Sequence, residues 1–312
     1  MRRREFLRRS GAAAGAVLLL PTGAFSAAPS LRSGELFRIS LAQWSLHRTI
    51  FAGELDPFEF PAIIREQYEL DAVEYVNTFY RDHATDPRYF ARLARHADEA
   101  GVRSLLIMCD GEGALGDPDA ALRARAVDNH RKWLDAAARL GCHSIRVNVH
   151  SQGTYDEQLR LAADGLRRLA ELGDDHGLDV IVENHGGLSS NGAWLAAVVR
   201  AADHPRAGTL PDFGNFRIST DPEEWYDRYQ GVAELMPFAR GVSAKSHEFD
   251  ERGEETGTDF TRMMRIVLDA GYRGYVGIEY EGDGLSEHEG ILATNRLLEC
   301  VRTRLAPQYQ AG

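Results

Sequence analysis

Three acidic residues in the second half of the chain each follow a short apolar run: Glu183, Asp212 and Glu279. Such a run is typical of a buried strand, and an acid that follows a strand often only caps the next helix. In a closed parallel barrel, however, all strand ends open onto one rim, so three such carboxylates would meet around a single pocket. The pattern therefore predicts a divalent-metal site. The apolar runs are residues 178–182, 207–211 and 275–278.

Polar side chains at alternate positions on or just beyond the predicted strands would line the same pocket. Successive residues of a strand point to opposite faces, so residues two apart share a face. If these faces point into the barrel mouth, the lining suits a polyhydroxylated ligand, which needs many hydrogen-bond partners. Each residue also has a structural interpretation, as part of an ion pair or as a loop hydrogen-bonder. The candidate substrate-binding residues are Gln43, His47, Glu74, Arg146, Asn148, His150 and His185.

The residue types favour chemistry on a carbonyl compound. Carboxylate oxygens with one imidazole suit Mg²⁺, Mn²⁺ or Co²⁺ better than they suit a metal that prefers thiolates. Such an ion would bind adjacent oxygens of a hydroxy-ketone and stabilise the enediolate formed by proton loss. Glu183 and Glu279 would act as base and acid on the two sides of that planar intermediate. Lys245 would polarise a substrate oxygen, or would simply pair with a neighbouring carboxylate.

Two ambiguities concern residues close to these candidates. Trp44 and Phe213 would either stack on a sugar ring or pack in the core. Glu281 would exchange roles with Glu279 if the frame of the last strand shifts by two residues, because side chains two apart share a face.

The elements that must position these residues are read from a recurring joint, in which a helical stretch ends in glycine and a β-rich run follows. It occurs at Gly101, Gly141, Gly177 and Gly271, where glycine can take the left-handed conformation that stops a helix. Strands are predicted near residues 37–43, 71–76, 102–109, 143–149, 178–184, 207–212, 240–246 and 274–280. Helices are predicted near residues 57–68, 87–100, 118–140, 155–176, 192–203, 222–237, 259–270 and 286–304.

Eight alternations of strand and helix predict the α/β class and a (β/α)8 TIM barrel, since eight parallel strands close around a side-chain-filled interior. The competing fold is an open doubly wound sheet, which would carry a glycine-rich phosphate turn after the first strand. Residues 43–47, Gln-Trp-Ser-Leu-His, do not form such a turn. We therefore expect one barrel domain over residues 29–312.

The first 28 residues have the pattern of an export signal. A basic stretch that includes Arg2, Arg3 and Arg4 precedes a short apolar run at residues 11–20 and a small-residue cleavage region at residues 24–28. The apolar run is too short to span a bilayer, which takes about 20 apolar residues. Paired arginines followed by Phe-Leu resemble a twin-arginine signal, with an ordinary secretory signal as the alternative. We expect a protein that is exported folded and is periplasmic or secreted.

The charge and the cysteine content limit the kinds of partner that the sequence suggests. The chain has 36 basic and 47 acidic residues, of which residues 1–28 hold five arginines and one glutamate, so the remainder has 31 basic and 46 acidic residues, a net charge of −15. This balance disfavours nucleic acid and anionic membranes and suits a small carbohydrate substrate. The three cysteines lack CxxC spacing, and Cys109 and Cys142 lie in apolar surroundings typical of a core. The sequence leaves open whether the protein forms a homo-oligomer.

Three motifs carry a resemblance to a known family. Glu-Asn-His-Gly-Gly at residues 183–187, Pro-Asp-Phe-Gly-Asn at 211–215 and Gly-Ile-Glu-Tyr-Glu-Gly at 277–282 resemble the xylose isomerase-like barrels, many of them sugar phosphate isomerases or epimerases. The resemblance implies Glu183, Asp212 and Glu279 as metal ligands, with a histidine from the seventh strand as the fourth. Ser243 stands where that histidine is expected, so His247, His185 or water would complete the shell.

The leading functional prediction is a metal-dependent sugar isomerase or epimerase that abstracts a proton next to a carbonyl and forms an enediolate. One alternative is an exported lyase that acts on 3-keto-glycosides, which shares the first chemical step. A second is a carbohydrate-binding barrel without catalysis. A DNA-repair nuclease, also found in this superfamily, would need a histidine-rich zinc cluster and a basic groove, and the sequence suggests neither.

Overall fold

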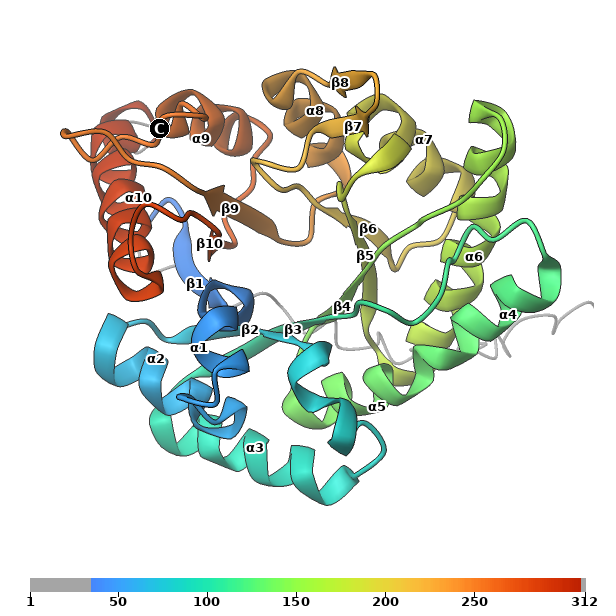
Figure 1. The fold of residues 1–312 in the computed structure, drawn as a ribbon, viewed down its shortest axis with the longest axis horizontal. Helices are drawn as coiled ribbons and strands as arrows, with labels where there is room; N and C mark the ends of the chain where they lie inside the picture. The colour runs from blue at the N-terminus through green and yellow to red at the C-terminus, as the bar shows by residue number, and fades with distance from the viewer. Residues whose placement is uncertain (1–34, 310–312) are drawn as a thin grey trace, which may run out of the picture. The chain divides into compact units, whose positions relative to one another are not determined.

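The computed structural model describes residues 35–309, in which eight parallel strands form one curled sheet (Figure 1). Neighbouring strands pair in the order β6-β5-β4-β3-β2-β1-β10-β9. The two outer strands of that order meet through bridges between Thr209 and Ala239 and between Asp212 and Ser243, which closes the ring. The predicted (β/α)8 TIM barrel is therefore confirmed. The strands are β1 (Arg38–Ala42), β2 (Ala72–Val76), β3 (Arg103–Met108), β4 (Ser144–Val147), β5 (Asp179–Glu183), β6 (Ala207–Leu210), β9 (Val242–Ser246) and β10 (Tyr275–Tyr280).

Helices surround the strands, and their ends carry the capping residues that the sequence suggests. Gly101, Gly141 and Gly177 have φ angles of 69°, 73° and 70°, so each ends its helix in the left-handed conformation. Thr154 and Glu157 form a capping box at the start of α6. The helices are α1 (His47–Phe51), α2 (Phe60–Tyr68), α3 (Pro87–Ala100), α4 (Ala120–Asn129), α5 (Arg131–Leu140), α6 (Tyr155–His176), α7 (Gly192–Ala202), α8 (Arg228–Leu235), α9 (Phe260–Asp269) and α10 (Glu287–Tyr309).

Two predicted helices differ from the structure. The stretch at 118–140 is two helices, α4 and α5, which are joined at His130, a buried residue whose Nδ1 lies 2.7 Å from the carbonyl oxygen of Ala126. The stretch at 222–237 begins instead with a short antiparallel hairpin, β7 (Arg217–Thr220) and β8 (Glu223–Trp225), and becomes helical only at α8. Strands this short have little periodicity for a sequence pattern to detect.

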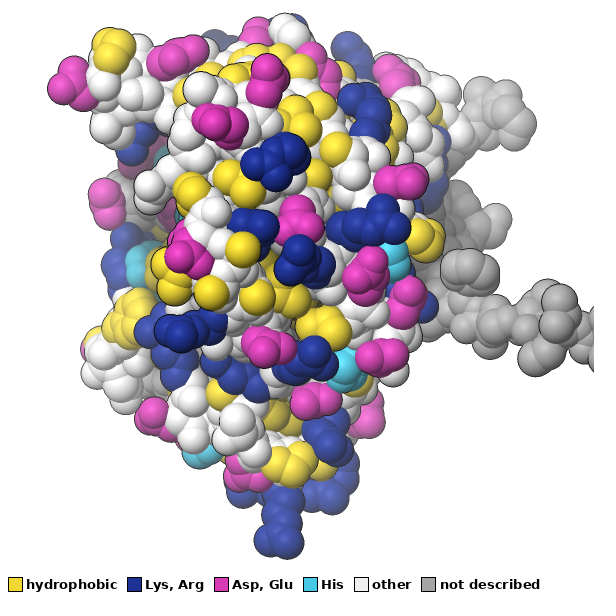
Figure 2. Space-filling view, turned by 90° about the vertical axis from the view of Figure 1, so that its right-hand side faces the viewer, with side chains coloured by type: hydrophobic (Ala, Val, Ile, Leu, Met, Phe, Trp, Pro, Cys, Tyr) yellow, Lys and Arg dark blue, Asp and Glu magenta, His cyan; other side chains and the backbone are white. Residues whose placement is uncertain are grey.

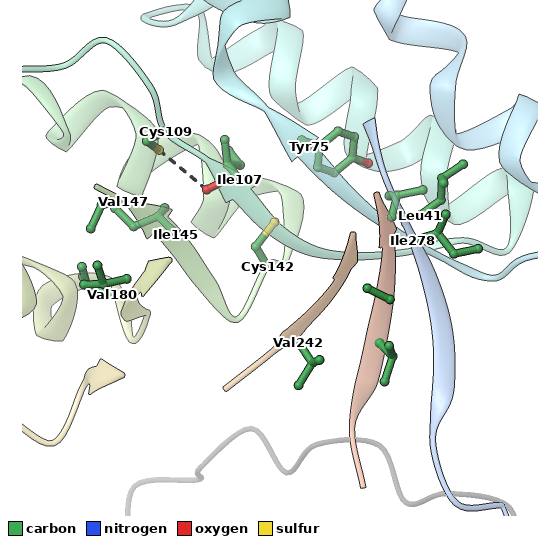
Figure 3. Packing of buried hydrophobic residues seen from close by; sticks show 14 of the residues in the cluster. Leu41, Tyr75, Ile107, Cys109, Cys142, Ile145, Val147, Val180, Val242 and Ile278 are labelled. Atoms are coloured by element: carbon green, nitrogen blue, oxygen red, sulfur yellow. Dashed lines mark hydrogen bonds between the residues drawn. The ribbon is translucent and has the colours of Figure 1, made fainter. Parts of the chain in front are cut away.

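Buried side chains form two layers on either side of the barrel wall. The outer layer lies between strands and helices; Figure 3 shows Leu41 of β1 beside Ile278 of β10, its partner in register. Cys109 and Cys142 are buried in this layer, as their apolar surroundings predicted, and both are free thiols. The inner apolar layer consists of Ala42, Val76, Leu106, Met108, Ile181 and Leu210, and a separate small group consists of Ala72, Leu105 and Tyr275.

The inner apolar layer also supports the site. Ile181 precedes Glu183 by two residues on β5, and Leu210 precedes Asp212 by two at the end of β6. Because side chains two apart share a face of a strand, Glu183 lies directly above this layer at the carboxyl end of β5. Asp212, two residues beyond the end of β6, converges with it.

Several expectations fall outside what the structure describes. The signal predicted at residues 1–28, and with it the start of the domain at residue 29, lies outside the described residues. Within residues 35–309, none of the helices has the length and apolarity needed to cross a membrane.

On the face shown in Figure 2, basic and acidic side chains are interspersed rather than gathered by sign.

Candidate metal and substrate site

The three acids of the opening prediction come together at the barrel mouth. One carboxylate oxygen from each of Glu183, Asp212 and Glu279 lies within 4.8 Å of the others, and all three residues are buried. They come from the ends of β5, β6 and β10, and closure of the ring brings these ends to one part of the mouth, with β9 between β6 and β10. In the part of the chain that the structure describes, this group has the spacing of a metal-binding cluster.

Ser243 occupies the position between two of these acids. Its Oγ lies 2.7 Å from Oδ2 of Asp212 and 2.8 Å from Oε2 of Glu279. A hydroxyl has one proton and can donate it to only one carboxylate at a time, so the second short contact needs either a protonated carboxyl or a cation nearby. The residue that replaces the expected histidine therefore bridges the cluster with a neutral oxygen.

Two asparagines fix the loops that carry the acids. Asn215 donates from Nδ2 to Oε1 of Glu183 at 2.9 Å, while its backbone nitrogen and that of Gly214 donate to Oδ1 of Asp212 at 2.8 Å. Asn184 accepts from the backbone nitrogen of Asp212 at 2.8 Å and donates to the carbonyl oxygens of Asp212 and Asn215. These bonds hold the orientation of the carboxylates before any ligand binds.

Two buried cations face the acids. Lys245, with 2% of its side chain exposed, places Nζ 3.5 Å from Oε1 of Glu279 and 3.2 Å from Oε1 of Glu281. Arg146, with 4% exposed, places Nε 2.8 Å from Oε2 of Glu183 and Nη1 2.7 Å from Oδ1 of Asp110. The frame ambiguity of the last strand is thereby resolved: Glu279 belongs to the cluster and Glu281 is a partner of Lys245.

The charge inside the barrel is consistent with a divalent cation. Four acids that are at most 3% exposed, Glu74 and the three cluster residues, face only two equally buried cations, Arg146 and Lys245. With every group ionised, this leaves two negative charges in a medium where uncompensated charge is costly. Oε2 of Glu183 is buried and, apart from its ion pair with Nε of Arg146 at 2.8 Å, accepts no hydrogen bond. The residues present therefore fit an oxygen-liganded divalent ion, for which Glu183, Asp212 and Glu279 supply three anionic ligands.

The acids also differ in their affinity for protons. Burial, helped by the nearby Glu279, raises the pKa of Glu183 to about 7 against the opposing effect of Arg146. Burial likewise raises the pKa of Asp212 to about 7, although Lys245 acts in the other direction. Burial alone would raise the pKa of Glu279, but Lys245, Arg146 and the hydrogen bond from Ser243 together lower it. Without a cation, the cluster therefore holds protons mainly on Glu183 and Asp212.

Two predicted substrate-binding residues make their polar contacts inside the protein. Strand β1 ends at Ala42, so Gln43 begins a turn in which its Oε1 accepts from the backbone nitrogen of Val76 at 3.0 Å and its Nε2 donates to the hydroxyl of Tyr80 at 2.8 Å. Glu74 accepts from Oγ of Ser40 at 2.7 Å, and burial raises its pKa to about 7. Substrate contact by Gln43 or Glu74 stays a prediction.

The structure places Asn148, His150 and His185 at the mouth, close to the Arg146 end of the cluster. Asn148 donates to Oδ1 of Asp110 at 2.8 Å, so Asp110 joins it to Arg146. His150 and His185 are exposed, yet enough protein surrounds their rings that burial lowers the pKa of both. Their neutral imidazoles would therefore meet a substrate at pH 7.

The two remaining candidate histidines, His47 and His247, lie outside the carboxylate cluster. His247 follows the end of β9 and is exposed, and the cluster does not include it, so its role as fourth ligand stays a prediction. His47 lies in α1, stacked on Trp44 with ring centroids 4.7 Å apart. Phe213 is fully buried and packs against Phe260, which settles its role as a core residue.

Sequence reasoning missed three residues that organise the site: Asp110, Asn184 and Asn215. Each follows the end of a strand by one to five residues, β3 for Asp110, β5 for Asn184 and β6 for Asn215. Position after a strand was the available signal, but loop residues have no periodicity that shows which way they point. Asn184 and Asn215 stand inside the motifs at 183–187 and 211–215.

Solved structures share the fold of this chain at low sequence identity. A structure of L-ribulose 3-epimerase has a TM-score of 0.65 at 14% identity and covers 87% of this chain and 96% of that chain. A structure of a xylose isomerase-like TIM barrel protein from Mycobacterium smegmatis in complex with magnesium has a TM-score of 0.63 at 16% identity. It covers 90% of this chain and 100% of that chain. At these identities the likeness shows the fold alone.

Curated relatives match shorter stretches at higher identity. The 3'-dehydrocarminate deglycosidase alpha subunit of a Microbacterium species is 36% identical over 166 residues, 53% of this chain and 37% of that protein. The inosose dehydratase of Erwinia tasmaniensis is 27% identical over 190 residues, 50% of this chain and 62% of that protein. The chain thus spans less than two thirds of the length of these relatives. The family model for the xylose isomerase-like TIM barrel matches residues 65–302, and the chain belongs to this family.

Proposed function

We propose that the protein is a divalent-cation-dependent lyase that removes the proton beside the ketone of a keto-glycoside and releases the group on the next carbon. The convergence of Glu183, Asp212 and Glu279 within 4.8 Å carries this proposal, because it offers a hard cation three anionic oxygens. The names of the two relatives, a deglycosidase and a dehydratase, both describe loss of a leaving group, which supports a lyase.

A bound divalent cation would supply a Lewis acid that polarises the ketone. The other steps fall to side chains. Glu183 or Glu279 takes the proton from the carbon next to the ketone, and the electrons of that C–H bond form the double bond of an enolate. Nζ of Lys245 donates a hydrogen bond to the enolate oxygen. The ketone then re-forms as the enolate carbon–carbon electrons make the product's double bond, and the leaving oxygen takes the electrons of the bond that breaks. The other glutamate, which must hold a proton when the substrate binds, donates it to that oxygen.

The contacts in the mouth support this division of work. Arg146 and Asn215 hold Glu183 from one side, and Ser243 and Lys245 hold Glu279 from the other. Carboxylates that are fixed in advance lose little entropy when the substrate binds, so proton transfer starts from a productive geometry. The products are an unsaturated keto sugar and the free hydroxyl compound.

The test is a turnover experiment in D₂O with Mn²⁺-loaded protein and a phenyl 3-keto-β-D-glucoside. The proposal predicts release of phenol, measured by absorbance, together with an unsaturated keto sugar, measured by NMR. Absence of phenol release, with the substrate recovered unlabelled, would rule the proposal out.

The second candidate is the isomerase or epimerase of the leading sequence prediction. Placement of two glutamates on separate strands, β5 and β10, favours it, because epimerisation needs a proton donor and an acceptor on opposite faces of one carbon. In the same experiment, an epimerase incorporates deuterium next to the ketone and releases no phenol.

We also propose that this activity lies outside the cytoplasm. The basic and apolar pattern of residues 1–28 supports export, and glycosides without phosphate groups suit a mouth that has a single buried arginine, Arg146.

A further inference from the structure

Four rings form a stacked group at the barrel mouth: Trp44, His47, Phe51 and Phe79, called here the aromatic cluster. Trp44 stacks on His47 with centroids 4.7 Å apart and on Phe79 at 6.0 Å. Phe51 meets the edge of Trp44 at 6.1 Å and lies 5.3 Å from Phe79. The proposed reaction uses none of these rings.

The aromatic cluster begins inside the barrel and ends in solvent. Trp44 and Phe79 both pack against the inner apolar layer, the layer that lies directly beneath Glu183. Phe51, at the outer end, is 61% exposed, the largest exposure of any large hydrophobic side chain in the described part of the chain. Contacts between apolar side chains therefore run from the buried layer beneath the acids, through Trp44 and Phe79, to the exposed ring of Phe51.

The α1 part of the aromatic cluster is held in place by hydrogen bonds. The buried carboxylate of Glu287 accepts hydrogen bonds from the backbone nitrogens of Arg48 and Thr49 and from Oγ1 of Thr49, at 2.6 to 3.0 Å. These contacts join α1 to the start of α10, so the helix that carries His47 and Phe51 is fixed to the barrel. A preformed flat surface binds a flat ligand at low entropic cost.

We propose that the aromatic cluster binds an aromatic ring system attached to the sugar, so that the substrates are aryl glycosides. This proposal rests on the proposed function, because it extends the substrate of that site. The polar mouth around Arg146 and Lys245 matches a sugar ring, whereas the cluster offers only ring faces, which prefer stacked or edge-to-face contact with another ring. Its continuity with the inner apolar layer places the two parts of the ligand in one site.

The test measures binding without turnover. Isothermal titration of the Mn²⁺-loaded protein compares phenyl β-D-glucopyranoside with methyl β-D-glucopyranoside, neither of which has the ketone needed for reaction. Each stacked ring contributes roughly 2- to 12-fold in affinity, so we expect the phenyl glycoside to bind more tightly by about that factor or more.

The variants Phe51→Leu and Phe79→Leu keep an apolar side chain and remove the ring, so each should reduce the phenyl preference. Phe58→Leu is the matched control, because Phe58 belongs to a separate group with Tyr89 and His96 and should leave the preference unchanged. Circular dichroism confirms that each variant is folded.

Equal affinity for the two glycosides would overturn the proposal, as would a phenyl preference that both ring variants retain. Equal affinity that falls in the ring variants would mean that the rings stack on the sugar itself. A dimer in sedimentation velocity that Phe51→Leu dissociates, without any phenyl preference, would assign the rings to a second copy. A phenyl preference without phenol release from the keto substrate supports the aromatic cluster and defeats the lyase; phenol release without the preference does the reverse.

Discussion

Replacement of Lys245 by methionine tests the charge balance of the site. The chain has two lysines, and Lys245 is the one whose side chain is 2% exposed and faces Glu279, Glu281 and Asn215. Methionine has similar length and no charge, so Lys245→Met leaves buried carboxylates without their partner. Loss of one member of a buried pair costs about 3–5 kcal/mol. At roughly 2–4 °C per kcal/mol for a domain of this size, Tm should fall by about 6–20 °C.

Thermal unfolding at pH 8 in EDTA, followed by circular dichroism, measures this loss. Mn²⁺ at 100 times its Kd for the wild-type protein should stabilise that protein by about 2.7 kcal/mol. At the same Mn²⁺ concentration the variant should gain more, because its cluster has more uncompensated negative charge and should bind the cation more tightly. Lys132→Met is the matched control. Lys132 is 32% exposed in its pair with Glu112, so solvent screens the pair and its loss should cost about 0–1 kcal/mol.

Two results would refute the reasoning. A fall in Tm of less than about 2 °C for Lys245→Met would show that the lysine does not balance the buried acids. Equal stabilisation of variant and wild type by Mn²⁺ would show that the cation does not occupy the same charge environment.

Three further predictions address catalysis, pH and export. Glu183→Gln and Glu279→Gln should each lower kcat roughly 10²- to 10⁴-fold while the fold stays intact. Glu171→Gln is the control and should keep full activity, because the side chain of Glu171 is 53% exposed on α6. Full activity in both site variants would remove the acid and base assignment. The pKa of Glu183 and of Asp212 is raised to about 7 in the folded protein, above their ordinary 4.5 and 3.8, so the folded state binds protons more tightly than the unfolded state. Metal-free protein should therefore lose stability as the pH rises from about 4.5 to 7, and its affinity for Mn²⁺ should rise over the same range. Urea unfolding measures the stability and titration calorimetry measures the affinity. A stability that increases with pH would contradict the assignment of these pKa shifts. Replacement of both Arg3 and Arg4 by lysine should retain the protein in the cytoplasm on cell fractionation, and normal export of that variant would exclude a twin-arginine signal.

Much of the fold could be predicted from local sequence rules. A glycine that ends a helix requires a left-handed conformation whatever surrounds it, so Gly101, Gly141 and Gly177 marked joints that the structure retains. The hairpin formed by β7 and β8 could not be predicted in this way. Its strands have four and three residues, too few for a pattern of alternation to stand out from the adjoining helix.

The site could be predicted from the sequence mainly for residues that lie on strands. Glu183 and Glu279 lie on strands, where the rule of alternation applies and their convergence follows from closure of the ring. Gln43 and His247 lie one residue beyond the strand ends, where alternation fails, and they are the positions whose surroundings differ most from the expected lining. Asn215 acts through the conformation of a loop, which depends on tertiary contacts with Asn184 that no single segment specifies.

Anomalous diffraction from crystals grown with Mn²⁺ tests the central claim most directly. We predict one strong manganese peak in the barrel mouth, with an oxygen of Glu183, of Asp212 and of Glu279 each within roughly 2.5 Å of it. A map without a peak at the mouth, or with manganese bound elsewhere while the three carboxylates contact only Ser243, Lys245 and Arg146, would contradict the metal site and the chemistry proposed for it.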